Sequence, residues 1–269
     1  MTIAAGFRCG GGIIFGADTY ESVGDLRDRV HKIPSIVETY CTAMLTGSCS
    51  DGHLMDALTE RLFDAIHGSR PTTHVELGGL LRDTVLRFYE QEMRVFPERN
   101  NSSISLLIAA RLPAEDEIEA WSMKSSVVRR MQDYEVLGIG VYVRHVLRHL
   151  YDQDMGLDDG AMAMTLLLSI AKQRLGFVGG DCYISALTPT GLASENATLS
   201  SPGDEAMYDY FLSTARRLVL ATGNARLTEQ QYENVLKEFG RRMKNYRERL
   251  ITTSSASFRT RLREQSTGP

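Results

Sequence analysis

The sequence predicts an α+β fold, a four-layer αββα sandwich followed by a helical extension at its C-terminal side. Three observations support this prediction. A glycine-centred β-hairpin opens the chain, strands and amphipathic helices then follow in a regular order, and a charged helical pattern replaces them after about residue 190. With 269 residues, 43% of them hydrophobic, the chain can bury a large core.

The first predicted element is the hairpin. Strands near 2–9 and 12–18 flank a triple glycine, which is typical of a tight turn between paired strands. Because a hairpin brings its two ends together, Thr2 and Asp18 should lie close in space. Lys32 follows in another short β-prone run. A lysine beside an aspartate stays protonated, and its charge lowers the pKa of a neighbouring hydroxyl or amine.

The later elements follow the order expected for two stacked sheets with helices on the outside. Apolar side chains recur at helical spacing or alternate at strand spacing along them. We predict a strand at 41–47, helices at 51–66 and 75–96, strands at 103–112, 117–122 and 134–138, helices at 141–151 and 157–175, and a strand at 181–187.

The start of the chain, Met1-Thr2, is the most informative site for chemistry. Removal of Met1 would leave a threonine that carries a hydroxyl nucleophile and an α-amine base on one residue. Such an amine has an ordinary pKa of about 7.7–8.0, so much of it is a free base near neutral pH. Taken alone, Asp18 would be interpreted as a turn residue and Lys32 as a surface lysine. An aspartate and a lysine at these two distances behind Met-Thr are much less expected by chance.

Residues 2–32 resemble the start of a proteasome β-type subunit, a member of the N-terminal nucleophile hydrolases. Thr2, Ala17-Asp18-Thr19 and Lys32 match the leading threonine, the Ala-Asp-Thr step and the lysine of that family. The segment 44–51 resembles its strand–glycine–helix segment. The resemblance implies the αββα sandwich of the N-terminal nucleophile hydrolase type over residues 2–190.

The resemblance also implies a threonine-type peptidase without a cofactor or metal. Thr2 would be the nucleophile, Asp18 and Lys32 would tune it, and the backbone N–H of Gly47 would bind the oxyanion. Peptides or unfolded proteins would be the substrates, and the resemblance leaves an ATPase partner open. The implied substrate pocket is apolar and consists of Tyr20, Val30, Pro34, Leu45 and Cys49.

Three positions depart from the family pattern. Ile139 stands where the family has a serine that positions the amine or its water, and Leu175 and Val178 replace an aspartate and a second serine. Ser48, Ser50 or Asp181 would be the candidates to supply the hydrogen bonds that these three apolar side chains cannot make. Two alternatives to the peptidase therefore stay open: a catalytically inactive proteasome-like scaffold protein, and a small-amide hydrolase on the same fold.

Residues 191–252 are predicted to form a helical extension. It comprises a helix at 205–221 and a long charged helix from the N-cap Thr228 to about residue 250. This length resembles the extended C-termini of Anbu-type bacterial proteasome relatives and predicts self-association into a ring or helical oligomer. The last segment, 253–269, is rich in Ser, Thr and Arg and is predicted to be disordered.

Composition excludes other classes of function. The net charge of −4 gives no nucleic-acid footprint, and neither an apolar run of membrane-spanning length nor a signal peptide is visible. The four cysteines lack paired metal spacing, so we expect reduced thiols in a cytoplasmic protein.

Overall fold

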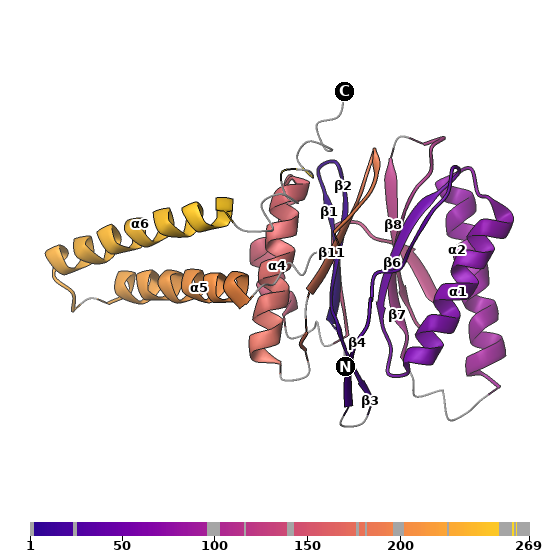
Figure 1. Cartoon of the computed structure of the whole chain (residues 1–269), viewed down its shortest axis with the longest axis horizontal. Helices are drawn as coiled ribbons and strands as arrows, with labels where there is room; N and C mark the ends of the chain where they lie inside the picture. Colours follow the sequence, from indigo (N-terminus) through magenta and orange to yellow (C-terminus); the bar gives the residue numbers. More distant parts are fainter. Residues whose placement is uncertain are drawn as a thin grey trace.

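The computed structural model describes residues 3–23, 26–95, 103–115, 117–138, 143–175, 178–180, 182–195, 202–224 and 226–252, together with 260 and 262. Two five-stranded antiparallel sheets lie face to face, and a pair of helices projects to one side (Figure 1). Within the described residues, no helix is both long enough and apolar enough to cross a membrane.

The first sheet has the strand order β10-β1-β2-β11-β12. Its centre is the predicted hairpin, in which Ala4 lies opposite Ala17 and Cys9 opposite Gly12. Gly11 has a positive φ of 85° at the turn, a conformation that favours glycine. The strands are β1 (Ile3–Cys9), β2 (Gly12–Asp18), β10 (Tyr134–Gly138), β11 (Cys182–Thr188) and β12 (Gly191–Glu195).

The second sheet has the order β5-β6-β7-β8-β9, and a separate hairpin, β3–β4, follows β2. Ion pairs join the two sheets, since Arg8 of β1 contacts Glu119 of β8 at 3.2 Å and Arg129 of β9 contacts Glu135 of β10 at 2.6 Å. The strands are β3 (Tyr20–Val23), β4 (Leu26–Arg29), β5 (Ser35–Val37), β6 (Thr42–Ser48), β7 (Ser105–Arg111), β8 (Ile118–Lys124) and β9 (Val127–Arg130).

Helices cover the outer face of each sheet. Helices α1 (Gly52–Ser69) and α2 (His74–Phe88) pack on the second sheet, and a π-helical turn, Tyr89–Met93, continues α2. Helices α3 (Arg144–Leu150) and α4 (Leu157–Arg174) pack on the first sheet. Side chains cap the first two: Asp51 accepts from the His53 N–H, and Thr73 forms a capping box with Glu76.

The buried apolar side chains form three clusters. One lies between the first sheet and α3 and α4, a second between the two sheets, and a third between the second sheet and α1 and α2. Strand β6 shows how the alternation of side chains creates this division, because Met44 belongs to the inter-sheet cluster while its neighbour Leu45 faces the helices.

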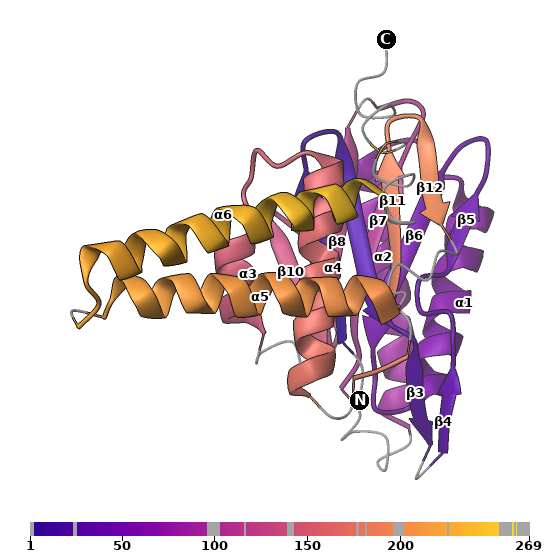
Figure 2. The same cartoon turned by 60° about the vertical axis from the view of Figure 1, so that its left-hand side comes forward.

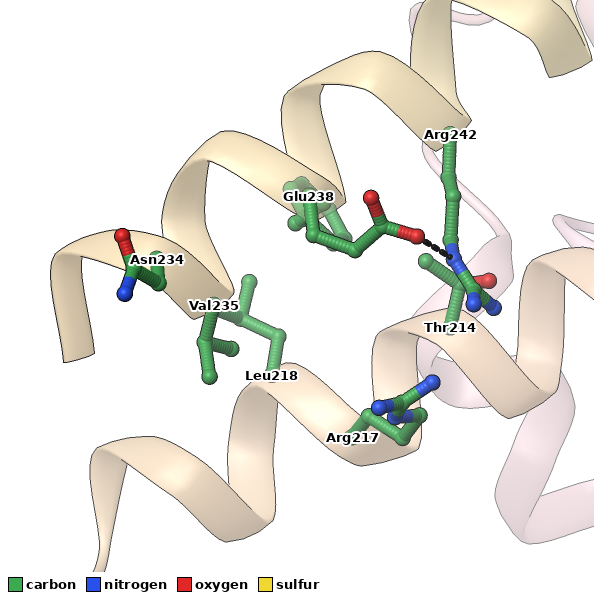
Figure 3. A pocket seen from close by; sticks show the side chains of 8 residues that line it. Thr214, Arg217, Leu218, Asn234, Val235, Glu238 and Arg242 are labelled. Carbon is green, nitrogen blue, oxygen red and sulfur yellow. Dashed lines mark hydrogen bonds and ion pairs between the residues drawn. The ribbon is translucent and has the colours of Figure 1, made fainter. Parts of the chain in front are cut away.

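Helices α5 (Pro202–Thr222) and α6 (Glu229–Thr252) form an antiparallel hairpin that projects from the rest of the chain beside α4 (Figures 1 and 2). A pocket of about 200 Å³ lies between them and includes none of the predicted site residues (Figure 3). Beyond the hairpin, Leu262 is fully buried in the cluster around α3 and α4. This residue of the segment predicted to be disordered therefore packs on the sheet domain.

The structure also moves several predicted boundaries. The first sheet extends past residue 190, because β12 pairs with β11 from Gly191↔Thr188 to Glu195↔Ile184, in a stretch that the sequence prediction assigned to the helical extension. Four short strands of three or four residues each were not predicted: β3, β4, β5 and β9. Lys32 lies between strands rather than within one.

Candidate active site

A buried carboxylate organises the candidate site. Asp18, at the end of β2, is fully buried. Its Oδ1 accepts hydrogen bonds from Lys32 Nζ at 3.1 Å and from the backbone N–H of Ile3 at 3.2 Å. Its Oδ2 accepts a longer one from the backbone N–H of Gly179 at 3.4 Å. Three segments far apart in the sequence therefore meet at one side chain.

Local pairing explains why these segments meet. The β1–β2 register, which sets Ala4 opposite Ala17, brings Ile3 beside Asp18. After the β3–β4 hairpin the chain returns, because the Val30 N–H donates to the Thr19 carbonyl at 2.9 Å, so Lys32 reaches the same point. The β11–β2 register places Cys182 opposite Asp18, which carries the preceding Gly179 to the carboxylate.

Burial and charge act in opposite directions on Asp18. Burial raises the pKa of its carboxyl above the ordinary value and outweighs the lowering effects of Lys32 and of the Ile3 and Gly179 N–H groups. The Lys32 side chain is itself only 11% exposed. The ion pair is therefore largely shielded from solvent. Because of this shielding, its two charges interact more strongly than they would at a surface.

The pairing of β5 with β6 relates Gly47 to the segment that carries Lys32. Ser35 is opposite Met44, and the Leu45 N–H donates to the Pro34 carbonyl at 2.9 Å. Continued by two further residues, this register would set Gly47 opposite Lys32. A Cβ atom on Gly47 would lie 2.6 Å from Met55 Cε and 2.9 Å from the Ser105 carbonyl oxygen, so any larger residue would displace its neighbours.

The five predicted pocket residues lie in different surroundings. Val30 and Pro34 are partly exposed and flank Lys32 along the chain. Leu45, only 1% exposed, and the half-buried Cys49 contact the cluster under α1 and α2. Burial raises the pKa of the Cys49 thiol. Tyr20 begins β3, and its side chain lies outside the described part of the structure.

Several positions bearing on catalysis lie outside the described residues: Met1, Thr2, Ile139 and Asp181. Leu175 is partly buried and Val178 is 5% exposed, and both pack with the cluster around α3 and α4. Being aliphatic, these two side chains supply no hydrogen bond. Ser48 is partly exposed and Ser50 is exposed.

Two polar groups of the site were missed by sequence reasoning. The Gly179 N–H donates to Asp18, but the sequence shows only a Gly-Gly pair and gives no indication of its hydrogen-bond partner. Thr46, beside Gly47, has a fully buried hydroxyl. The alternation of β6 could have indicated its inward orientation. No three His, Cys, Asp or Glu side chains within the described part of the chain come together to hold a metal ion.

Comparisons with known proteins identify the fold. No protein-family model and no curated protein sequence matches the chain. Solved structures do match. A mutant of Anbu from Hyphomicrobium sp. strain MC1 superposes with a TM-score of 0.72 at 13% identity, covering 85% of this chain and 100% of that one. Anbu from Yersinia bercovieri, described as an ancestral β-subunit, gives 0.66 at 12% identity over 84% and 99% of the two chains.

A third match concerns a protein that was solved as an assembly. The helical assembly of the Anbu complex from Pseudomonas aeruginosa matches with a TM-score of 0.68 at 11% identity, over 84% of this chain and 97% of that one. The structural neighbours of this chain are thus Anbu proteins, and the similarity extends over most of its length. At these low identities the similarity establishes the fold.

Proposed function

We propose that the chain is an N-terminal threonine hydrolase with peptidase activity, built on the four-layer αββα sandwich of the N-terminal nucleophile hydrolases. After removal of Met1, Thr2 Oγ attacks a peptide carbonyl and the Thr2 amine takes up the hydroxyl proton. The Gly47 N–H stabilises the oxyanion. The amine then protonates the leaving nitrogen, and water hydrolyses the Thr2 ester to free the acid and regenerate the hydroxyl.

The observation that carries this proposal is the hydrogen bond from the Ile3 N–H to Asp18. That nitrogen is the amide nitrogen of the Thr2–Ile3 peptide bond, about 1.33 Å from the Thr2 carbonyl carbon. Thr2 is therefore bonded to a nitrogen atom that lies 3.2 Å from Asp18 Oδ1, the same oxygen that accepts a hydrogen bond from Lys32. Positive charge from Lys32 beside the nucleophile favours its deprotonation.

The pocket residues Tyr20, Val30, Pro34, Leu45 and Cys49 belong to the proposal as the substrate-binding wall. Val30 and Pro34 each lie two positions from Lys32 along the chain. Leu45 and Cys49 pack with the cluster under α1 and α2. Their apolar character favours an apolar side chain of a peptide substrate.

We further propose that the chain self-associates. The α5–α6 hairpin projects from the sandwich, and Val219, Leu220 and Leu236 on it are between 42% and 70% exposed. Apolar side chains grouped on a projecting element favour contact with another protein surface. The Anbu complex from Pseudomonas aeruginosa, which has the same fold, forms a helical assembly.

The test combines intact mass, covalent labelling and turnover. The purified protein should lack the mass of Met1, react with a β-lactone at Thr2 and cleave fluorogenic peptides. The Thr2→Ala variant should lose both labelling and cleavage while keeping its melting temperature. Retention of Met1 would contradict the proposal. A protein without Met1 that shows no Thr2-dependent labelling would indicate the inactive scaffold instead, and labelling with turnover of small amides alone would indicate the amide hydrolase.

A further inference from the structure

Strand β6 carries a hydroxyl whose burial calls for an explanation. Thr46 is 0% exposed, and its Oγ1 has no hydrogen-bond partner among the described residues. Burying a polar group without a partner opposes folding, so native proteins keep few such groups. A valine would fill nearly the same volume without this cost. The hydroxyl therefore has a reason to be there other than stability.

The alternation of β6 locates this hydroxyl. Leu45 faces α1 and α2, whereas Met44 faces the opposite sheet, so Thr46 shares the inter-sheet side with Met44. The β5–β6 pairing reaches Leu45, whose N–H donates to the Pro34 carbonyl, and continuing it by one residue would set Thr46 opposite Ile33, the neighbour of Lys32. The inter-sheet cluster that contains Met44 and Ile33 also contains Ala4, two residues from Thr2 along the chain. Thr46 pairs with Leu107 of β7, another member of this cluster, and the Leu107 side chain lies against Gly6 of β1. Thr46 therefore faces the first sheet on the side of β1.

The proposed chemistry needs a polar group there. An amine acts as a base on its own hydroxyl only when its lone pair is directed toward that hydroxyl, which requires its N–H groups to be held. Asp18 already accepts from Lys32, Ile3 and Gly179. Leu175 and Val178 are apolar. Thr46 offers a buried oxygen with unused acceptor capacity.

We propose that Thr46 is a positioning residue for the nucleophile. Its Oγ1 accepts a hydrogen bond from the Thr2 amine, directly or through one water, and turns the amine lone pair toward the Thr2 hydroxyl. This inference rests on the proposed function, and it explains how the site works with apolar side chains at 175 and 178. Hydrogen-bond acceptance favours the protonated amine, so Thr46 also raises the pKa of that amine.

The test compares Thr46→Val, which removes the hydroxyl at nearly constant shape, with Thr46→Ser, which keeps it. Thr42→Val is the matched control on the same face of β6, at its other end. Thr46→Val should slow β-lactone labelling of Thr2 by about 10- to 100-fold, on the scale of a lost acid–base contribution. KM for a fluorogenic peptide should be unchanged, the acidic limb of the pH–rate profile should move to lower pH, and the melting temperature should be equal or higher. Thr46→Ser and Thr42→Val should label within about threefold of the wild type.

Each other outcome overturns the inference. A Thr46→Val rate equal to the wild type would show that the hydroxyl does not act on Thr2, while the proposed function would stand if labelling still requires Thr2. A slow rate accompanied by a lower melting temperature and an unmoved pH profile would indicate a merely structural role. Wild-type protein that shows no Thr2-dependent labelling would overturn both this inference and the proposed function.

Discussion

Replacing Lys32 by methionine tests the buried ion pair that organises the site. The substitution keeps the unbranched stem of the side chain but leaves Asp18, which is fully buried, without its cation. Removing one partner of a buried pair typically costs about 3–5 kcal/mol. An upper limit follows from protonation. Protonating a carboxyl with an ordinary pKa of about 3.9 at pH 7 costs about three pH units, each about 1.4 kcal/mol, or about 4 kcal/mol in total. If the unpaired charge would cost more than this, Asp18 takes up a proton and the loss of stability rises no further. We expect a loss of about 3–4 kcal/mol in the free energy of unfolding at pH 7.

The pH dependence has a definite sign. Burial already raises the folded-state pKa of Asp18 above its unfolded value, and loss of Lys32 raises it further. A group with a raised folded pKa contributes its stability below the unfolded pKa and loses it as the pH rises through the folded pKa. The difference between wild type and Lys32→Met should therefore shrink by up to about 1.4 kcal/mol per unit as the pH falls from 7 toward 4.

Urea unfolding followed by circular dichroism at pH 4, 5, 6 and 7 measures both effects. Lys237→Met is the matched control, because Lys237 is 74% exposed and lies 4.0 Å from Glu233 on α6. It should cost less than about 1 kcal/mol at every pH. A penalty for Lys32→Met below about 1 kcal/mol at pH 7, or one that does not change with pH, would refute the assignment of a buried charge pair.

Two further predictions address the packing of the chain. Leu262→Ala should lower the free energy of unfolding by about 3 kcal/mol, because Leu262 is fully buried in the cluster between the first sheet and α3 and α4. A loss below about 1 kcal/mol in urea unfolding would contradict this packing. Burial, with help from Asp159 and Asp158, raises the pKa of the Cys9 thiol to about 12, so native protein at pH 8 should react with iodoacetamide at the half-buried Cys49 well before Cys9. Peptide mapping after a short exposure would show the order, and equal modification of both cysteines would count against it.

Much of the candidate site could be predicted because hairpin geometry is local. The two predicted strands around the triple glycine imply that Thr2 lies near Asp18. Thr2 itself lies outside the described residues, but the neighbouring Ile3 N–H donates a hydrogen bond to Asp18, as the hairpin geometry requires. The approach of Lys32 to Asp18 was also expected, although the chain reaches it by a hairpin and an irregular segment rather than by a strand. The contribution of Gly179 could not be predicted, because it depends on pairing across more than 160 residues.

The missed elements share a physical cause. Strands β3, β4, β5 and β9 have three or four residues each, too few for an alternating pattern to be distinguished from a loop. β12 has five residues but is built largely from small side chains, which resemble a loop in composition. β5, β9 and β12 are edge strands that form where a longer neighbouring strand offers free backbone groups, whereas β3 and β4 pair with each other in a separate hairpin.

By itself, the sequence determined the order of the long elements, the opening hairpin and the meeting of the chain start with Asp18. These follow from local periodicity and turn chemistry, which act over a few residues. Only the tertiary structure decided which polar groups Asp18 holds, that Thr46 buries its hydroxyl beside Gly47, that Leu262 returns to the core and that α5 and α6 project as a hairpin. Burial and hydrogen-bond partners are properties of segments brought together across the chain, and no local pattern encodes them.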